Sequence, residues 1–120
     1  LGRSIDGADQ ADAVDGDPFS FAFVGPAVDD GRVTDALEEM ARRYPPMSLP
    51  AGPVWFAAGG VEPGNVSSVV AAGARRVAVS TAVFRASDPF AVTEELAAAL
   101  RAAWVSDPGA EAYGNDAFTA

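Results

Sequence analysis

The sequence predicts an α/β protein in which a parallel β-sheet carries helices on its outer side. Short apolar runs, rich in β-branched and aromatic residues, alternate along the chain with segments whose apolar residues recur at helical spacing. We find no hairpin signal between consecutive strands, so a helix is expected to connect each strand to the next. The length of 120 residues suits one compact domain with a hydrophobic core.

Four strands are expected from the apolar runs. The run 19–24 is aromatic and ends at Gly25-Pro26, whereas the run 54–58 ends at Gly59-Gly60. Glycine and proline at these ends are typical of strand boundaries. The expected strands are residues 1–5, 19–24, 54–58 and 76–80.

Four helices are expected between and after these strands. Thr34 and Asp88 are typical N-cap residues, and Pro89 suits the first position of the last helix. Gly73 is expected to end the third helix, and Asn65 to begin it. The expected helices are residues 6–16, 35–43, 65–72 and 89–104.

Four βα units are half of a (β/α)8 barrel. An open four-stranded parallel sheet is the alternative, and it would expose two edges. A half-barrel leaves an apolar seam, so we expect it to pair with an N-terminal half-barrel that this chain lacks, or with a second copy in a homo-oligomer. This domain is placed at residues 1–105, followed by an acidic, flexible tail at residues 106–120.

The composition excludes several function classes. The net charge is −9, from 17 acidic and 8 basic residues, and such a surface repels nucleic acids and anionic membranes. Without cysteine or histidine, the chain lacks disulfides, thiolate chemistry and the commonest general base and metal ligand. No apolar run reaches the roughly 18 residues that a membrane-spanning helix needs. We therefore expect a cytoplasmic protein with a small-molecule ligand.

Small residues at the ends of two strands form the candidate binding site. Gly59 and Gly60 end the third strand, and Ser80 and Thr81 end the fourth. Small residues let the backbone approach an anion, and oriented N–H groups bind it without a titrating side chain. In (β/α)8 barrels a phosphate usually binds at the exits of strands 7 and 8. The plainer alternatives are close helix–sheet packing for the glycines and ordinary strand-end hydroxyls for Ser80 and Thr81.

Several short motifs follow one another in a specific order and spacing. They are Leu1-Gly2-Arg3-Ser4, Phe23-Val24-Gly25-Pro26, Trp55-Phe56-Ala57-Ala58-Gly59-Gly60-Val61, Gly64-Asn65-Val66, Ala71-Ala72-Gly73-Ala74-Arg75-Arg76-Val77-Ala78-Val79, Ala82-Val83 and Asp88-Pro89. Together these motifs resemble the C-terminal half of the thiamine phosphate synthase and thiazole tautomerase family. The resemblance covers roughly residues 1–104 and is strongest over residues 55–89.

The resemblance implies a (β/α)8 barrel and a transferase of thiamine biosynthesis. The synthases of this family join a pyrimidine pyrophosphate to a thiazole phosphate, with Mg²⁺ as cofactor, and release pyrophosphate. Gly60 matches a glycine whose N–H binds the thiazole phosphate, and Ser80-Thr81 matches the strand exit that binds the same group. Ser4 matches a serine near the pyrophosphate.

The chain departs from the family after Gly25-Pro26. The synthases carry a Pro-Thr-x-Thr-Lys loop that holds the pyrophosphate, whereas this chain has Asp29, Asp30 and Arg32 there. The two carboxylates would repel pyrophosphate unless they held a metal, and Arg32 is a candidate replacement for the lysine. The tautomerases of the family carry a histidine just after the serine, and this chain has Ile5-Asp6 in that region. The residues that bind the pyrimidine and Mg²⁺ belong to the first half of the family, outside this chain.

These observations leave three functions open. The first is part of a thiamine phosphate synthase-like enzyme, in which catalysis relies on orientation and on electrostatic stabilisation of the departing pyrophosphate. The second is a catalytically inactive relative that binds a phosphorylated ligand, which the missing threonines and lysine favour. The third is an assembly module whose open seam binds another chain and no ligand.

Overall fold

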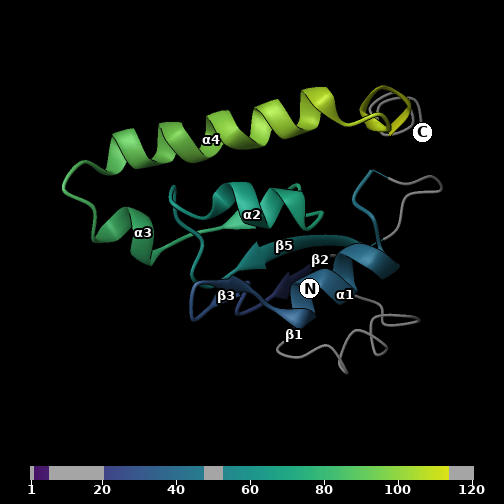
Figure 1. Ribbon diagram of the computed structural model, residues 1–120, viewed down its shortest axis with the longest axis horizontal. Helices are drawn as coiled ribbons and strands as arrows, with labels where there is room; N and C mark the ends of the chain where they lie inside the picture. Colours follow the sequence, from purple (N-terminus) through teal and green to yellow (C-terminus); the bar gives the residue numbers. More distant parts are fainter. Residues whose placement is uncertain (1, 6–20, 48–52, 114–120) are drawn as a thin grey trace.

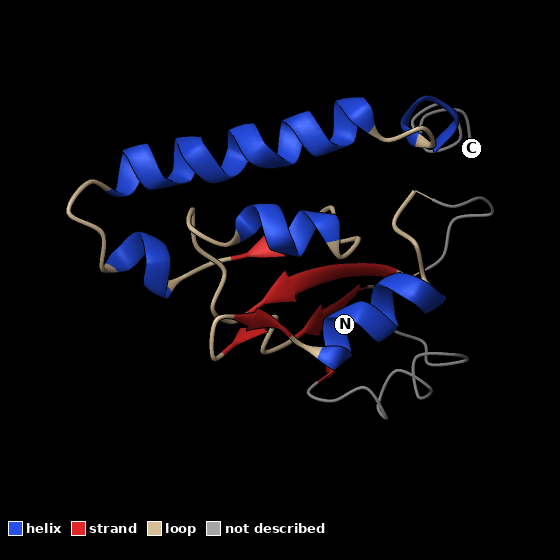
Figure 2. Cartoon of the chain, viewed as in Figure 1, coloured by secondary structure: helices blue, strands red, loops and turns tan. Residues whose placement is uncertain are grey.

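The computed structural model describes residues 2–5, 21–47 and 53–113. Within these residues, four parallel strands form one sheet in the order β1-β2-β5-β6 (Figures 1 and 2). The strands are β1 (Gly2–Ile5), β2 (Phe21–Val24), β5 (Val54–Ala58) and β6 (Val77–Ala78). The α/β class and the parallel sheet are confirmed, and the fourth strand is shorter than expected.

The sheet follows the order of the chain. Each strand of this sheet pairs with the one that follows it along the chain. The register places Ser4 beside Phe23 and Ala57 beside Val77. All carboxyl ends therefore lie at one edge of the sheet, which brings the exits of β5 and β6 together. The expected helix at residues 6–16 lies outside the described residues.

Four helices occupy the described segments, and their starts follow local capping chemistry. The helices are α1 (Asp35–Arg43), α2 (Val66–Ala71), α3 (Thr81–Phe84) and α4 (Pro89–Ser106). Thr34 Oγ1 accepts a hydrogen bond from the N–H of Leu37 at 3.4 Å, and Asp88 Oδ1 accepts one from Ala91 at 3.1 Å. Both N-caps agree with the sequence-based prediction. None of the described helices is long and apolar enough to cross a lipid bilayer.

The short helix α3 was not expected from the sequence, and the same is true of a hairpin between β2 and α1. Strands β3 (Val28–Asp29) and β4 (Arg32–Val33) pair in an antiparallel manner. The prediction that no hairpin occurs is therefore wrong. Its turn has positive φ at both central residues, +50° at Asp30 and +73° at Gly31, which is the type I′ geometry that Asp-Gly favours.

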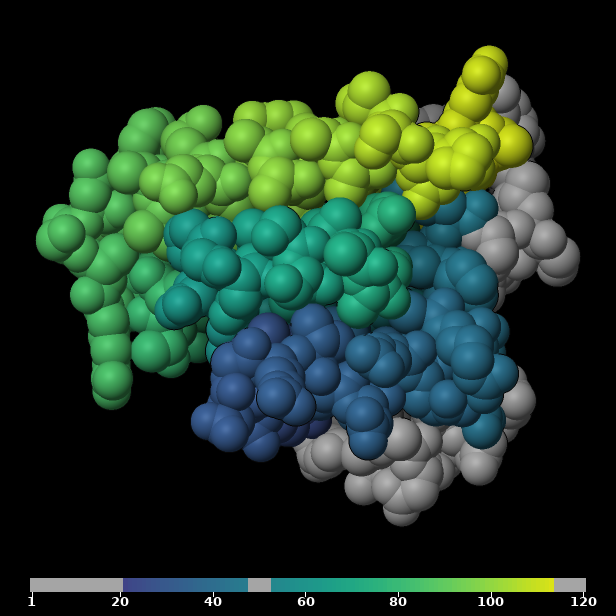
Figure 3. All heavy atoms as spheres, viewed as in Figure 1, coloured from purple at the N-terminus to yellow at the C-terminus, as the bar shows by residue number. Residues whose placement is uncertain are grey.

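The core lies between one face of the sheet and the helices. Ala22 and Val24 of β2 and Trp55 and Ala57 of β5 alternate along their strands and are buried. They belong to one hydrophobic cluster with residues of α1, α2 and α4, which are Ala36, Leu37, Met40, Val66, Val69 and Leu96. Helix α4 runs alongside α2 at the surface (Figures 1 and 3). The helices therefore cover a single face of the sheet.

The opposite face carries three phenylalanine rings. Phe21, Phe23 and Phe56 alternate with the buried residues, and their ring centroids lie 5.3, 6.3 and 5.8 Å apart. Phe23 remains 38% exposed although it lies in the middle of the sheet. This aromatic face is therefore only partly covered in the isolated chain.

The beginning of the expected tail contacts the preceding domain. Arg75 Nε donates to Asp107 Oδ2 at 3.0 Å, with both side chains less than 20% exposed. Arg76 donates to the Tyr113 hydroxyl at 2.9 Å and stacks over the ring of Trp104 at 5.5 Å. Residues 110–113 form a further helical turn. Up to Tyr113 the chain is thus held against the domain, and residues 114–120 lie outside the described residues.

Glu39 on α1 provides a test of surface electrostatics. Hydrogen bonds from Arg42 and then Arg43 lower the pKa of Glu39 to about 2, from an ordinary value of 4.5. Because the pKa of Glu39 is lower in the folded protein, its ionised carboxylate stabilises the folded state at pH values above the pKa of the unfolded state. This stabilisation is lost as the pH falls from about 4.5 towards 2. We expect Glu39→Gln to flatten the pH dependence of the unfolding free energy in that window.

Urea unfolding at several pH values between about 6 and 2.5 measures this effect. Glu38→Gln is the matched control, because Glu38 precedes Glu39 on the same helix and its side chain makes no ion pair or hydrogen bond with the described residues. A Glu39→Gln protein whose unfolding free energy depends on pH in the same way as that of the wild type would contradict the prediction.

Candidate functional site

The exits of β5 and β6 lie side by side and border one cavity. The register pairs Ala58 with Ala78, the last residues of the two strands. A cavity of about 570 Å³ opens beside them, within the size range of small-molecule sites. Its lining includes Gly59, Gly60, Ser80 and Thr81, together with the charged residues Glu62 and Arg85. The four residues predicted to bind phosphate are thus brought together.

Gly60 has a backbone conformation that other residues rarely adopt. Its φ is +80°, in the left-handed region, and the φ of Gly59 is +89°. A Cβ atom at Gly60 would lie 2.6 Å from the carbonyl oxygen of Val28 on β3. Glycine is therefore required here by both the φ angle and the close approach of the hairpin.

The carbonyl groups at the exit of β5 are already engaged. Ala58 O accepts from the N–H of Ala27 at 2.7 Å, and Gly59 O accepts from the N–H of Val28 at 3.1 Å. These bonds attach the glycine turn to the beginning of the hairpin. The carbonyl oxygens are consequently directed into the protein and are not available to repel an anion in the cavity.

The N–H groups of the two exits are available. Within the segments that the structure describes, no hydrogen bond links the N–H of Gly60, Ser80 or Thr81 to another residue. All three residues are exposed to solvent. Several free N–H groups beside one cavity, with the neighbouring carbonyls engaged, are the arrangement that binds an oxyanion.

Arg85 is a candidate that the sequence-based prediction missed. It follows α3 and lines the same cavity as Thr81, whose carbonyl accepts from its N–H at 3.0 Å. Its guanidinium makes no ion pair or hydrogen bond with the described residues. The four-residue spacing between Thr81 and Arg85 would have revealed their proximity, had a helix been expected there.

Known proteins that resemble the chain share one name. The thiamine-phosphate synthase of Thermobifida fusca is 36% identical to this chain over 108 residues, covering 86% of this chain and 48% of that protein. The thiamine-phosphate synthase of Mycolicibacterium vanbaalenii is 35% identical over 107 residues, with coverages of 86% and 47%. The chain belongs to the thiamine-phosphate synthase family.

Further comparisons define how much of the family this chain represents. The thiamine-phosphate synthase of Streptomyces avermitilis is 53% identical over a shorter stretch of 47 residues, which is 39% of this chain and 22% of that protein. No protein-family model matches the chain. The chain spans about half the length of the thiamine-phosphate synthases that match most of it. The family inferred from the sequence motifs is confirmed.

The other residues suggested by the family resemblance lie elsewhere. Ser4 is in β1, which β2 and β5 separate from β6 in the sheet. Asp29, Asp30 and Arg32 form the exposed tip of the hairpin, where Asp29 pairs with Arg32 in the β3–β4 register. These hairpin residues do not line the cavity at the exits of β5 and β6.

The tip of the hairpin carries two adjacent carboxylates, those of Asp29 and Asp30. Mg²⁺ is usually bound by one or two carboxylates together with waters and substrate phosphates. Among the described residues, no group of three or more acidic side chains lies close enough together to hold a metal ion. A metal ion at the tip of the hairpin would therefore take its remaining ligands from water and from the phosphate groups of a substrate.

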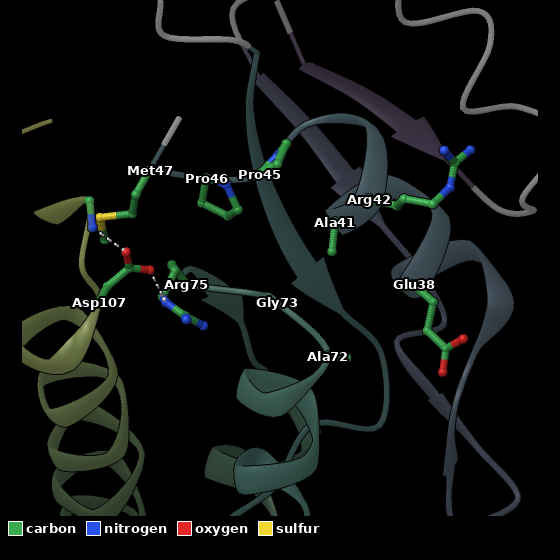
Figure 4. A pocket seen from close by; sticks show the side chains of 11 residues that line it. Glu38, Ala41, Arg42, Pro45, Pro46, Met47, Ala72, Gly73, Arg75 and Asp107 are labelled. Carbon is green, nitrogen blue, oxygen red and sulfur yellow. Dashed lines mark hydrogen bonds and ion pairs between the residues drawn. The ribbon is translucent and has the colours of Figure 1, made fainter. Parts of the chain in front are cut away.

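A second cavity of about 460 Å³ lies between the C-terminal half of α1 and the segments that follow α1, α2 and α4 (Figure 4). Arg75 and Asp107 point toward each other there, and Arg75 Nη1 also donates to the carbonyls of Val70 and Ala74 at 3.0 and 2.9 Å. The guanidinium of Arg42, on α1, is bonded to Glu39. Both arginines thus already have protein partners, so this cavity is a weaker candidate for an anion than the strand exits.

Proposed function

We propose that this chain is the phosphate-binding half of a thiamine phosphate synthase-like (β/α)8 barrel. It binds the thiazole phosphate at the exits of β5 and β6 and serves thiamine biosynthesis. The observation that carries this proposal is that the N–H groups of Gly60, Ser80 and Thr81 border one cavity and have no hydrogen-bond partner among the described residues. The relatives are named thiamine-phosphate synthases, and a product that carries a phosphate supports a phosphate-binding site in this chain.

The cavity residues have separate tasks in this proposal. The N–H groups hold the phosphate oxygens, and the Arg85 guanidinium neutralises part of the phosphate charge. A phosphate fixed in this way orients the thiazole ring for attack on the pyrimidine, and orientation is a large part of the catalysis of such a reaction. Arg32 on the hairpin remains our candidate for contact with pyrophosphate, as does Ser4 on β1.

The proposal also includes a second half-barrel. The strands follow in sequential order, the helices cover one face, and the aromatic face with Phe21, Phe23 and Phe56 is only partly covered. Relatives about twice as long as the matched region support an N-terminal half-barrel as the occupant of that face. It would also supply the pyrimidine and Mg²⁺ sites.

One observation favours the catalytically inactive alternative. The segment that should hold the pyrophosphate is a tight hairpin with two exposed carboxylates, Asp29 and Asp30, at its tip. Carboxylates raise the energy of a nearby pyrophosphate instead of lowering it. A chain that binds the thiazole phosphate without turnover would be consistent with this feature.

Two measurements separate these functions. Titration calorimetry determines whether the chain binds the thiazole phosphate, and mass spectrometry determines whether thiamine phosphate forms with the pyrimidine pyrophosphate and Mg²⁺ present. Both are repeated after addition of the N-terminal half of the Thermobifida fusca protein. Binding with turnover supports the synthase, and binding without turnover supports the inactive relative. A folded chain that does not bind the thiazole phosphate in either sample would overturn both.

A further inference from the structure

The side chain of Asn65 bonds to the glycine turn instead of to its own helix. Asn65 occupies the N-cap position of α2, yet it makes no side-chain hydrogen bond to the helix. The corresponding residues of α1 and α4, Thr34 and Asp88, each accept a hydrogen bond from an N–H of their own helix with their side chain. The carboxamide of Asn65 instead donates from Nδ2 to Gly60 O at 2.7 Å and accepts at Oδ1 from the N–H of Glu62 at 2.9 Å.

The first of these bonds fixes the peptide unit between Gly60 and Val61, and the second fixes the next unit, between Val61 and Glu62. A trans peptide is planar, and its C=O and N–H groups point in opposite directions. Because Asn65 holds the Gly60 carbonyl, the N–H of Val61 must point away from the carboxamide. In the described segments this N–H makes no hydrogen bond, and Val61 lines the cavity at the strand exits.

The preceding peptide unit is fixed by a different partner. Its carbonyl, Gly59 O, is bonded to the hairpin at Val28, so its N–H, that of Gly60, points away from the hairpin. Consecutive N–H groups are thus set by two anchors, the hairpin for Gly60 and Asn65 for Val61. A glycine allows a wide range of ψ angles, and the bond from Asn65 to the Gly60 carbonyl restricts this rotation.

We infer that Asn65 is a positioning residue for phosphate binding, which aims the N–H of Val61 at the anion and keeps the Gly60 carbonyl out of the cavity. This inference rests on the proposed function. It adds Val61 to the donors Gly60, Ser80 and Thr81. Without the carboxamide, the Gly60–Val61 peptide can turn its carbonyl oxygen toward the phosphate, which replaces an attraction with a repulsion.

The test compares Asn65→Ala and Asn65→Ser with wild type. Serine is a good N-cap residue, so Asn65→Ser preserves the start of α2, but its hydroxyl is too short to bridge Gly60 and Glu62. Both variants are expected to bind the thiazole phosphate about tenfold more weakly, the effect of one lost hydrogen bond. Binding of the dephosphorylated thiazole alcohol is expected to stay unchanged. The matched control is Ser67→Ala, an exposed position in the first turn of α2.

Calorimetric titrations with both ligands and a thermal unfolding curve for each variant give the readouts. A selective loss of affinity for the phosphorylated ligand supports the inference. Folded variants with wild-type affinity would overturn it, and so would an equal loss for both ligands accompanied by a lower Tm, which indicates a purely structural role. A wild-type chain that fails to bind the thiazole phosphate contradicts the proposed function itself and removes the basis of the inference.

Discussion

Replacement of Gly60 by alanine is expected to weaken binding of the thiazole phosphate by about a hundredfold. Gly60 has a φ of +80°, and an added Cβ would lie 2.6 Å from Val28 O. The turn can accept alanine only by moving away from the hairpin, which breaks the bond between Gly59 O and the Val28 N–H. The N–H groups that we propose as phosphate ligands then lose their alignment. Titration calorimetry with the thiazole phosphate measures the change.

Gly64→Ala is the matched control for this substitution. Gly64 lies in the same loop, its φ is not in the left-handed region, and its added Cβ would meet only Glu62 Oε1 at an ordinary distance of 3.5 Å. We expect this variant to bind as wild type. A Gly60→Ala protein that is folded, as judged by circular dichroism, and retains wild-type affinity would show that the phosphate site lies elsewhere.

Truncation of Trp55 is expected to have the largest effect on stability. Trp55 is 1% exposed in the centre of the core, and its Nε1 donates to the carbonyl of Tyr44 at 2.8 Å. Trp55→Ala should lower the free energy of unfolding by about 3–5 kcal/mol, because it removes a large apolar side chain and leaves a cavity. Urea unfolding followed by circular dichroism measures this difference, which is large compared with the total stability of a small domain.

Two further variants separate the contributions at this position. Trp55→Phe keeps most of the apolar contact but loses the N–H donor, and should cost about 1–2 kcal/mol. Phe23→Ala removes an aromatic ring from the opposite face, where it is 38% exposed, and should cost less than Trp55→Ala. An equal loss for Trp55→Ala and Phe23→Ala would contradict our assignment of the core to the helix-covered face.

Elements with a strong local signal could be predicted from the sequence. The caps at Thr34 and Asp88 depend on the side chain of one residue and the N–H groups of its own helix, so tertiary structure does not enter. The apolar runs of β2 and β5 likewise identify strands without knowledge of their neighbours. Four residues at the strand exits were identified in the same way, because small residues after an apolar run can be recognised locally.

The remaining features depend on partners that are distant in the sequence or on very short segments. Helix α3 has four residues, too few for periodicity to be recognised, and Arg85 was missed with it. Asn65 was expected only to begin a helix, whereas its side chain bonds to Gly60 and Glu62. The Asp30-Gly31 turn did carry a local signal, but the segment between β2 and α1 was interpreted as a loop because its strands have two residues each.

The order β1-β2-β5-β6 has a consequence for biogenesis on the ribosome. Every crossover in the described sheet joins strands that are already neighbours, so each new strand needs only the segment synthesised just before it. Contacts at short sequence separation form fastest, because little chain entropy is lost when they close. The sheet can therefore grow by vectorial addition of strands at the β6 edge while translation continues, and its assembly does not have to wait for the last residues of the polypeptide.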